Sequence, residues 1–166
     1  DGLSLREMRT MKTAIKAGIA GAVLVVGGAA HAELHGEEAE IAARDAAVRQ
    51  YAAKLEADLQ QCLRKPETKT TQDSGLCAYA MREAAKDAVK EKYQKALATA
   101  KEYVDKGWLP KNVPAMMPQA QAAWEQFVEA DCGVVGALIT GTASATYQIV
   151  CEYKHQIQRL HDLDQW

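Results

Sequence analysis

The chain has 166 residues, enough for one ordinary domain, with 20 Lys and Arg against 22 Asp and Glu. Its formal net charge of −2 argues against a nucleic-acid partner, because such partners require a clearly basic surface. A mildly acidic surface permits a basic protein partner without requiring one.

In chain order, the first feature is a targeting segment at residues 11–32. Met11 begins a basic stretch, and an apolar run follows over residues 17–30. The run ends in Ala30-His31-Ala32, the small-residue pattern of a signal-peptide cleavage site. A membrane anchor is the alternative, but about 14 apolar residues are too few to cross ~30 Å of hydrocarbon as a helix.

Cleavage after Ala32 leaves residues 33–166 as a single helical domain, and we expect residues 1–10 to be an upstream extension outside the native protein. The removed segment holds four basic and two acidic residues, so the net charge of the remaining chain becomes −4. We therefore expect a periplasmic or secreted protein with no stable membrane insertion after signal cleavage.

Four cysteines, Cys62, Cys77, Cys132 and Cys151, all follow the predicted cleavage site. An even number of cysteines behind a signal peptide predicts disulfides, because the compartment is oxidising. Of the three possible pairings we favour Cys62–Cys77 and Cys132–Cys151, since each joins the end of one helical segment to the next. A zinc site is the alternative, but there is no C-x-x-C and no nearby histidine pair at ligand spacing.

Apolar residues recur at helical spacing in four segments, and none shows the alternation of a strand. A polar stretch over residues 65–75 predicts a loop, with Asp73 or Ser74 as N-cap of the second helix. Three prolines over residues 108–118 predict a stiff connector, with Pro118 in the first turn of the third helix. The predicted helices span residues 37–62, 76–106, 119–131 and 143–163. The fold class is therefore all-α, an irregular four-helix bundle with two disulfides.

The few aromatic side chains are expected to anchor a core built largely of small residues. Trp124 and Phe127 lie at helical spacing and are predicted core residues. Trp108 is expected to cover the core from the connector, with an exposed binding anchor as the alternative. Trp166, at the end of the chain, is expected to be loosely held.

The histidines form no catalytic or metal-binding pattern. His35 lies among glutamates, where a solvated terminus is favoured over a metal site. Glu152 and His155 share a helix face, yet di-metal sites use that pair twice with further carboxylates. His161 indicates only a polar C-terminal end. With no zinc-protease, nucleophile-elbow or phosphate-loop motif, we predict no enzyme activity, no metal and no cofactor.

Two stretches resemble a known family. The first reads TQDSGLCAYAMREAAKDAVKEKYQKAL, beginning at Thr71. The second runs through Ala120-Gln121-x-x-Trp124, Asp131-Cys132, Thr140-Gly141-Thr142, Cys151 and Arg159-x-x-x-Leu163. In this order and spacing, the chain resembles the N-terminal domain of the lysozyme-inhibitor LprI-like family over about Cys62 to Leu163.

The resemblance implies a helical, disulfide-bonded envelope protein that binds a protein partner, possibly lysozyme. The implied mechanism is occlusion of a muramidase cleft by a protruding loop, for which Thr140, Gly141, Thr142 and Ser144 are the candidate contacts. The alternative for Gly141-Thr142 is a turn that caps the last helix. The alternative function is a non-enzymatic interaction module for another envelope protein.

Overall fold

The computed structural model describes residues 28–166, with side-chain surroundings for Gly36 and residues 38–166. The expected extension at residues 1–10 and the predicted signal peptide up to residue 27 lie outside this part, and so does the side chain of His35. The chain divides into two units, Asp1–Gly36 and Glu37–Trp166, and the second unit forms the helical bundle.

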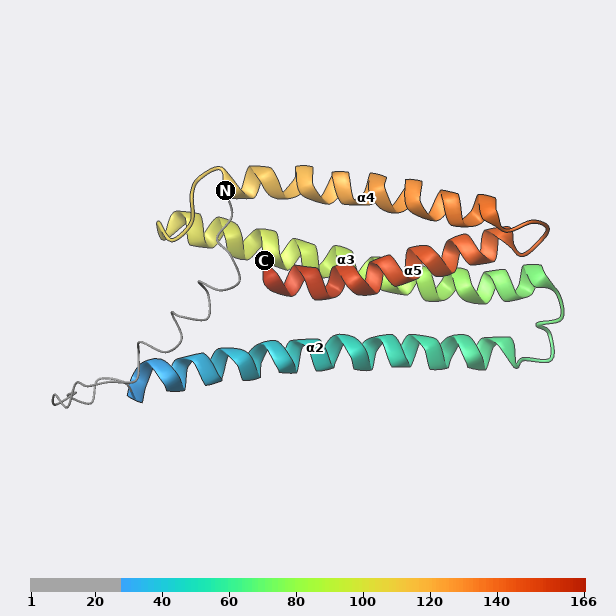
Figure 1. Cartoon of the computed structure of the whole chain (residues 1–166), viewed down its shortest axis with the longest axis horizontal. Coiled ribbons are helices and arrows are strands. Elements are labelled where there is room, and N and C mark those ends of the chain that lie inside the picture. The colour runs from blue at the N-terminus through green and yellow to red at the C-terminus, as the bar shows by residue number, and fades with distance from the viewer. Residues whose placement is uncertain (1–27) are drawn as a thin grey trace, which may run out of the picture. The chain divides into compact units, whose positions relative to one another are not determined.

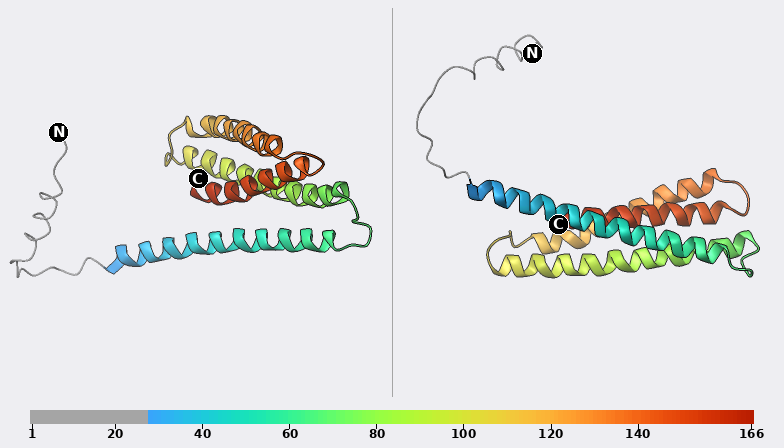
Figure 2. Two further views of the ribbon diagram at one scale, coloured as in Figure 1. Left: turned by 45° about the vertical axis from the view of Figure 1, so that its right-hand side comes forward. Right: turned by 90° about the horizontal axis from the view of Figure 1, so that it is seen from below.

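Within residues 28–166 there are four α-helices and no strand, which confirms the predicted all-α class. They are α2 (Gly28–Leu63), α3 (Thr71–Asp105), α4 (Val113–Leu138) and α5 (Ser144–Asp162), followed by the 3₁₀ turn η1 (Leu163–Gln165). Consecutive helices run in opposite directions, so the α2–α3 and α4–α5 connections lie at the same end (Figure 1). The views in Figure 2 also show α3, α4 and α5 side by side.

Helix α3 begins at Thr71, five residues earlier than predicted, because Thr70 and Asp73 form a capping box. The backbone N–H of Asp73 donates to Thr70 Oγ1 at 3.1 Å, and the backbone N–H of Thr70 donates to Asp73 Oδ2 at 2.9 Å. Hydrogen bonds lower the pKa of the Asp73 carboxyl. The largest effect comes from the Thr70 hydroxyl, and the backbone N–H groups of Lys69 and Thr70 add to it. Asp73, one of the two predicted N-cap residues, therefore lies within the first turn and completes the capping box, whereas Thr70 is the N-cap.

Helix α4 begins at Val113, so the prediction of a non-helical connector up to Pro118 was wrong for its second half. Pro114 occupies the first helical turn, where no backbone donor is needed. Pro118 lies inside the helix and exposed, at the cost of one backbone hydrogen bond. At its other end α4 continues to Leu138, beyond the predicted end at residue 131. Gly136 lies where α4 comes close to Gln148 of α5. A Cβ there would lie 3.1 Å from the Gln148 side chain.

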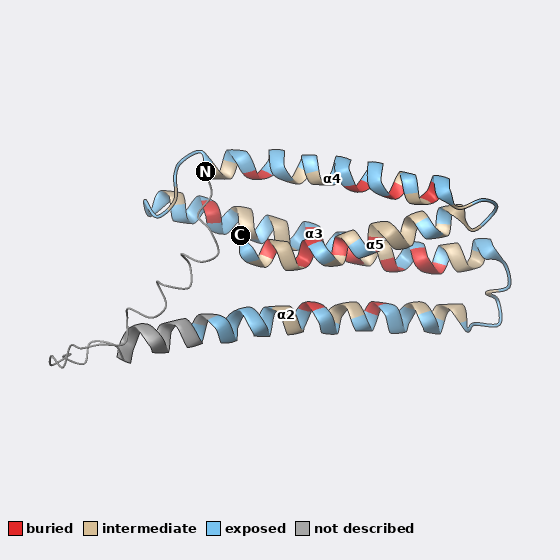
Figure 3. Ribbon diagram, in the orientation of Figure 1, coloured by how far each residue is buried: buried red, intermediate tan, exposed pale blue. Residues whose placement is uncertain are grey.

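The core lies where α2, α3 and α5 meet, and buried residues line their facing sides (Figure 3). Tyr153 of α5 is 4% exposed and packs with Leu55, Met81 and Ala85. In a second cluster, Val48 of α2 packs with Val89, Leu160 and Leu163. Helix α2 thus reaches the other helices through large side chains spaced seven residues apart.

The aromatic residues expected in the core are only partly there. Trp108 is 66% exposed and Phe127 is 55% exposed, so both predictions of burial were wrong, whereas Trp124 is half-buried. The Trp108 ring instead packs locally against Tyr103, with 5.3 Å between ring centroids. Trp166 is 48% exposed, and its ring centroid lies 4.5 Å from the Arg159 guanidinium.

Candidate functional site

Both disulfides lie at the end of the bundle that carries the α2–α3 and α4–α5 connections. Cys62–Cys77 joins the last turn of α2 to the second turn of α3, with 5.8 Å between Cα atoms. Cys132–Cys151 joins α4 to α5, with 5.6 Å between Cα atoms. The predicted pairing is confirmed. We refer to this cross-linked end as the loop end.

The loop between α4 and α5 projects its predicted contact residues at the loop end. Thr140, Gly141 and Thr142 are exposed, and Gly141 has a φ of 84°, a conformation that favours glycine. Ser144 is only partly exposed, because its hydroxyl donates to the Gly136 carbonyl at 2.6 Å and its N–H to the Gly141 carbonyl at 3.3 Å. Three of the four predicted residues therefore form the exposed tip, and the fourth closes the turn beneath it.

A shallow groove of about 520 Å³ lies beside this tip, and we refer to it as the terminal groove. Leu76 and Tyr79 line it from α3, Ile149 lines it from α5, and Thr142 of the tip lines its edge. Leu76 is 63% exposed and Tyr79 is 47% exposed. The tip and the terminal groove together present polar hydroxyls beside uncovered apolar surface.

The stretch from Cys132 to Cys151 contains no charged residue. It includes the exposed apolar side chains of Leu138 and Tyr147 on either side of the tip. Removing a charged group from water is the largest cost of burying a polar surface, and burial of this stretch against a partner avoids that cost. The loop end is thus suited to contact with another protein.

The histidine pairs serve structural contacts between helices. His155 Nε2 lies 2.9 Å from Asp131 Oδ2 on α4, whereas Glu152, on the same face of α5, binds Arg82 of α3 at 2.9 Å. His161 Nδ1 lies 2.9 Å from Asp45 Oδ1 and ties α5 to α2, a partner that the sequence did not indicate.

One cluster resembles a metal site only in its composition. Ligand atoms of Asp131, Cys132, Cys151 and His155 lie within 4.8 Å of one another. Both sulfur atoms are committed to the disulfide, which leaves one carboxylate and one imidazole. A structural zinc site requires four such ligands.

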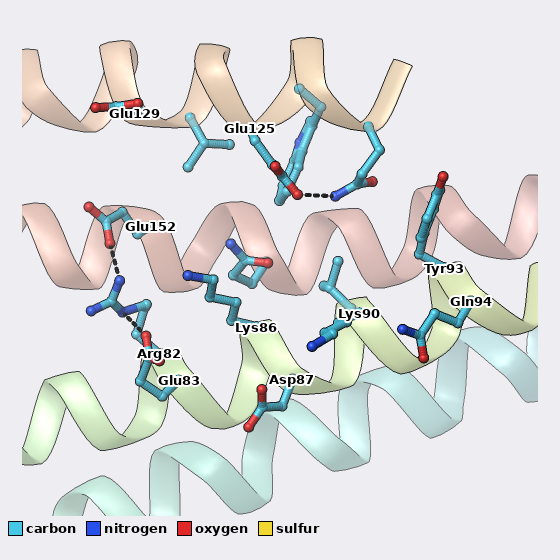
Figure 4. A pocket seen from close by; sticks show the side chains of 15 residues that line it. Arg82, Glu83, Lys86, Asp87, Lys90, Tyr93, Gln94, Glu125, Glu129 and Glu152 are labelled. Carbon is cyan, nitrogen blue, oxygen red and sulfur yellow. Dashed lines mark hydrogen bonds and ion pairs between the residues drawn. The ribbon is translucent and has the colours of Figure 1, made fainter. Parts of the chain in front are cut away.

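A larger groove of about 790 Å³, which we name the side groove, separates α3 from α4 above a floor contributed by α5 (Figure 4). Lys86 and Lys90 extend into it from α3, and Glu125 and Glu129 lie along α4. Sequence reasoning missed this site. The available signal was the spacing of four residues in both charged pairs, which places each pair on one helix face.

A buried arginine organises one end of the side groove. Arg159 is 7% exposed, and its guanidinium lies between Trp124 at 5.3 Å and Trp166 at 4.5 Å. Its Nε and Nη2 donate to Gln121 Oε1 at 3.2 and 3.0 Å. Burial lowers the pKa of Arg159. The two indole faces and the Gln121 amide contact the guanidinium, and the charges of Asp162 and Glu125 partly offset the effect of burial on its pKa.

The fold is that of a helical protein with two disulfides and an exposed α4–α5 loop at the loop end. Residues 62–163 match the family described as lysozyme inhibitor LprI, and the chain belongs to this family. The matched part includes both disulfides, the tip and the side groove. None of the curated proteins and none of the solved structures matches the chain. Of the described helices, none has the length and apolar character needed to cross a membrane.

Proposed function

We propose that the protein binds a lysozyme-type muramidase outside the cytoplasm and inhibits it by inserting the α4–α5 tip into the substrate cleft. The family assignment supports an inhibitor. The observation that carries the finer proposal is the exposed, uncharged tip, held between two helices by a disulfide. Two disulfides also suit an oxidising compartment.

The chemistry of the tip is compatible with such a cleft. Glycosidases of this class carry two carboxyl groups beside the scissile bond. The tip brings no carboxylate near them, and the hydroxyls of Thr140 and Thr142 can donate hydrogen bonds to them. Gly141 has no side chain, which allows close approach of the backbone to the cleft wall.

The Cys132–Cys151 disulfide supports the proposal because it reduces the conformational entropy that the loop would lose on binding. A flexible loop loses conformational entropy when it enters a cleft, and this loss subtracts from the binding free energy. Cys132–Cys151 closes the α4–α5 hairpin, and the Ser144 hydroxyl fixes the turn beneath the tip. The tip is thus ordered before it meets a partner.

The test is a muramidase assay on bacterial cell walls with the purified, disulfide-bonded protein in excess. Thr140→Arg and Thr142→Arg should each weaken inhibition at least tenfold, because the long arginine side chain would clash with the cleft wall where a small hydroxyl is proposed to fit. Thr99→Arg is the matched control, since Thr99 is exposed on α3 and lies ~30 Å along the helix from Tyr79. Gly141→Trp is less informative, because its strained φ would change the loop itself.

Unchanged muramidase activity in the presence of excess protein would refute inhibition of that enzyme. Capture of a different envelope protein by the same loop end would then favour an interaction module. Equal inhibition by Thr142→Arg and Thr99→Arg would show that the tip is not the contact.

A further inference from the structure

Four side chains that can bind a metal lie together between α4 and α5. Asp131 and Cys132 come from α4, and Cys151 and His155 come from α5. One ligand atom of each lies within 4.8 Å of the other three, and the part of the chain that the structure describes holds no second group of this kind. Two sulfurs, one imidazole nitrogen and one carboxylate oxygen are all ligands of Zn²⁺.

The disulfide withholds both sulfurs from a metal, because the ligand that Zn²⁺ binds is a thiolate. A dithiol of the thiol–disulfide oxidoreductase class can supply them. It donates two electrons and two protons, the bond between Cys132 and Cys151 breaks to give two thiols, and the dithiol closes to its own disulfide. Every newly made chain is in the same thiol state before the disulfide first forms. The reduced chain thus offers four ligands where the oxidised chain offers two.

The backbone already places these ligands close to the geometry of a zinc site. In a tetrahedral site with bond lengths of ~2.0–2.3 Å, the ligand atoms are ~3.3–3.8 Å apart. The present separations require movements of about 1 Å, which side-chain rotation supplies. Cys151 and His155 are four residues apart on α5, a spacing that places two metal ligands on one helix face.

The imidazole of His155 is already directed at a second ligand. Its Nε2 lies 2.9 Å from Asp131 Oδ2, and its ring packs nearly perpendicular to the Phe127 ring. Zn²⁺ can take the place of the proton between these two atoms. The side chains of His155 and Asp131 are 25% and 48% exposed, whereas Cys132 is fully buried. The histidine and the aspartate therefore give a metal ion a path from solvent to the sulfurs.

We propose that reduction of the Cys132–Cys151 disulfide creates a Zn²⁺ site formed by Asp131, Cys132, Cys151 and His155. Metal binding releases the two thiol protons, and a neutral imidazole and a carboxylate complete the four ligands. Zinc then joins α4 to α5 where the disulfide did, so the hairpin keeps a cross-link in the reduced chain. This site does not depend on muramidase inhibition.

The test adds Co²⁺ to the purified protein after reduction with a phosphine, which brings no competing thiol, and then displaces it with Zn²⁺. Tetrahedral Co²⁺ bound by thiolates gives intense visible bands and a sulfur-to-metal charge-transfer band. We expect one metal ion per chain in the reduced protein. The oxidised protein, with two of the four ligands, should bind at least ~100-fold more weakly.

Two histidine variants form a matched pair. His155→Gln removes one ligand and should weaken metal binding at least ~10-fold. His161→Gln is the control and should bind as the unaltered protein does. The His161 side chain is also 25% exposed and also lies 2.9 Å from an aspartate, Asp45, but it belongs to no such ligand group. Both variants keep all four cysteines, so the reduction step is the same in each.

Cysteine variants and heating assign the site within the folded chain. Cys132→Ser with Cys151→Ser should abolish the charge-transfer band, whereas Cys62→Ser with Cys77→Ser should retain it, because that pair belongs to no such ligand group. Zn²⁺ should raise the unfolding temperature of the reduced protein as its concentration rises, and should do so less for His155→Gln. Thiols of an unfolded chain would not give this stabilisation.

Four results would overturn the proposal. They are absence of the charge-transfer band in the reduced protein, equal binding by His155→Gln and His161→Gln, a band that survives serine at Cys132 and Cys151, and an unfolding temperature that Zn²⁺ does not raise. The muramidase assay uses the oxidised protein and variants of the tip, so the two proposals can fail independently.

Discussion

Tyr153 gives the sharpest test of the packing between α2, α3 and α5. Its ring is 4% exposed, and its hydroxyl lies 3.3 Å from Glu56 Oε1 and 3.4 Å from the Ala52 carbonyl of α2. Burial, followed by the negative charge of Glu56, raises the pKa of Tyr153 from 10.0 to about 12. The folded chain therefore holds the phenol proton to higher pH than the unfolded chain does.

The sign of the pH dependence follows from this difference. The stabilising contribution is fully present below about pH 10 and is lost as the pH rises toward 12. Two pKa units correspond to about 2.7 kcal/mol in total, of which about 1.4 kcal/mol is lost by pH 11. Tyr153→Phe removes this titration, and at neutral pH it costs at most about 1 kcal/mol because both hydrogen bonds are long.

The assay is urea unfolding followed by circular dichroism at about pH 8 and pH 11, with both disulfides intact. The unaltered protein should lose about 1.4 kcal/mol more than Tyr153→Phe between these two pH values. Tyr147→Phe, at a position that is 54% exposed, should behave as the unaltered protein does. If Tyr153→Phe loses as much stability as the unaltered protein, the buried phenol does not titrate as described and the reasoning fails.

Two further predictions concern the core and the disulfides. Ala85 is fully buried against Tyr153, so Ala85→Leu should cost about 1–3 kcal/mol in urea unfolding, whereas Leu at the exposed Ala98 should change stability by less than about 0.5 kcal/mol. Replacing Cys132 and Cys151 by serine should cost about 3 kcal/mol and also weaken muramidase inhibition in the cell-wall assay. If the serine variant loses about 3 kcal/mol of stability but still inhibits fully, the disulfide does not contribute to the proposed contact.

The helices and the disulfide pairing could be predicted because both depend on short-range pattern. Cysteines 15 and 19 residues apart bracket the two connections at the loop end, and helical periodicity identifies what they join. Helix starts were harder to predict. Thr70 takes the cap position because the Asp73 side chain accepts a hydrogen bond from its backbone N–H. Pro114 lies in the first turn of α4, a helix that the spacing of Pro110, Pro114 and Pro118 argued against.

The side groove and the true positions of the aromatic residues could not be predicted, because both depend on which helices approach each other. Phe127 lies at helical spacing from Trp124, yet it is 55% exposed, and its ring is nearly perpendicular to the His155 ring with 5.4 Å between the centroids. The groove exists because α3 and α4 both pack on α5 while their charged faces remain apart. Sequence spacing shows which residues share a face, but not whether that face meets another helix.

The placement of the covalent cross-links bears on where this protein meets a partner. All four cysteines are paired at the loop end, whereas the α3–α4 connection at the other end is held by contacts such as the 2.8 Å hydrogen bond from Trp108 N–H to the Tyr103 carbonyl. Either location would restrict the unfolded chain, so stability alone does not require both disulfides at one end. Preorganisation for binding does favour this placement, because rigidity lowers the cost of binding only where the contact forms. The position of the disulfides therefore supports the loop end as the contact surface.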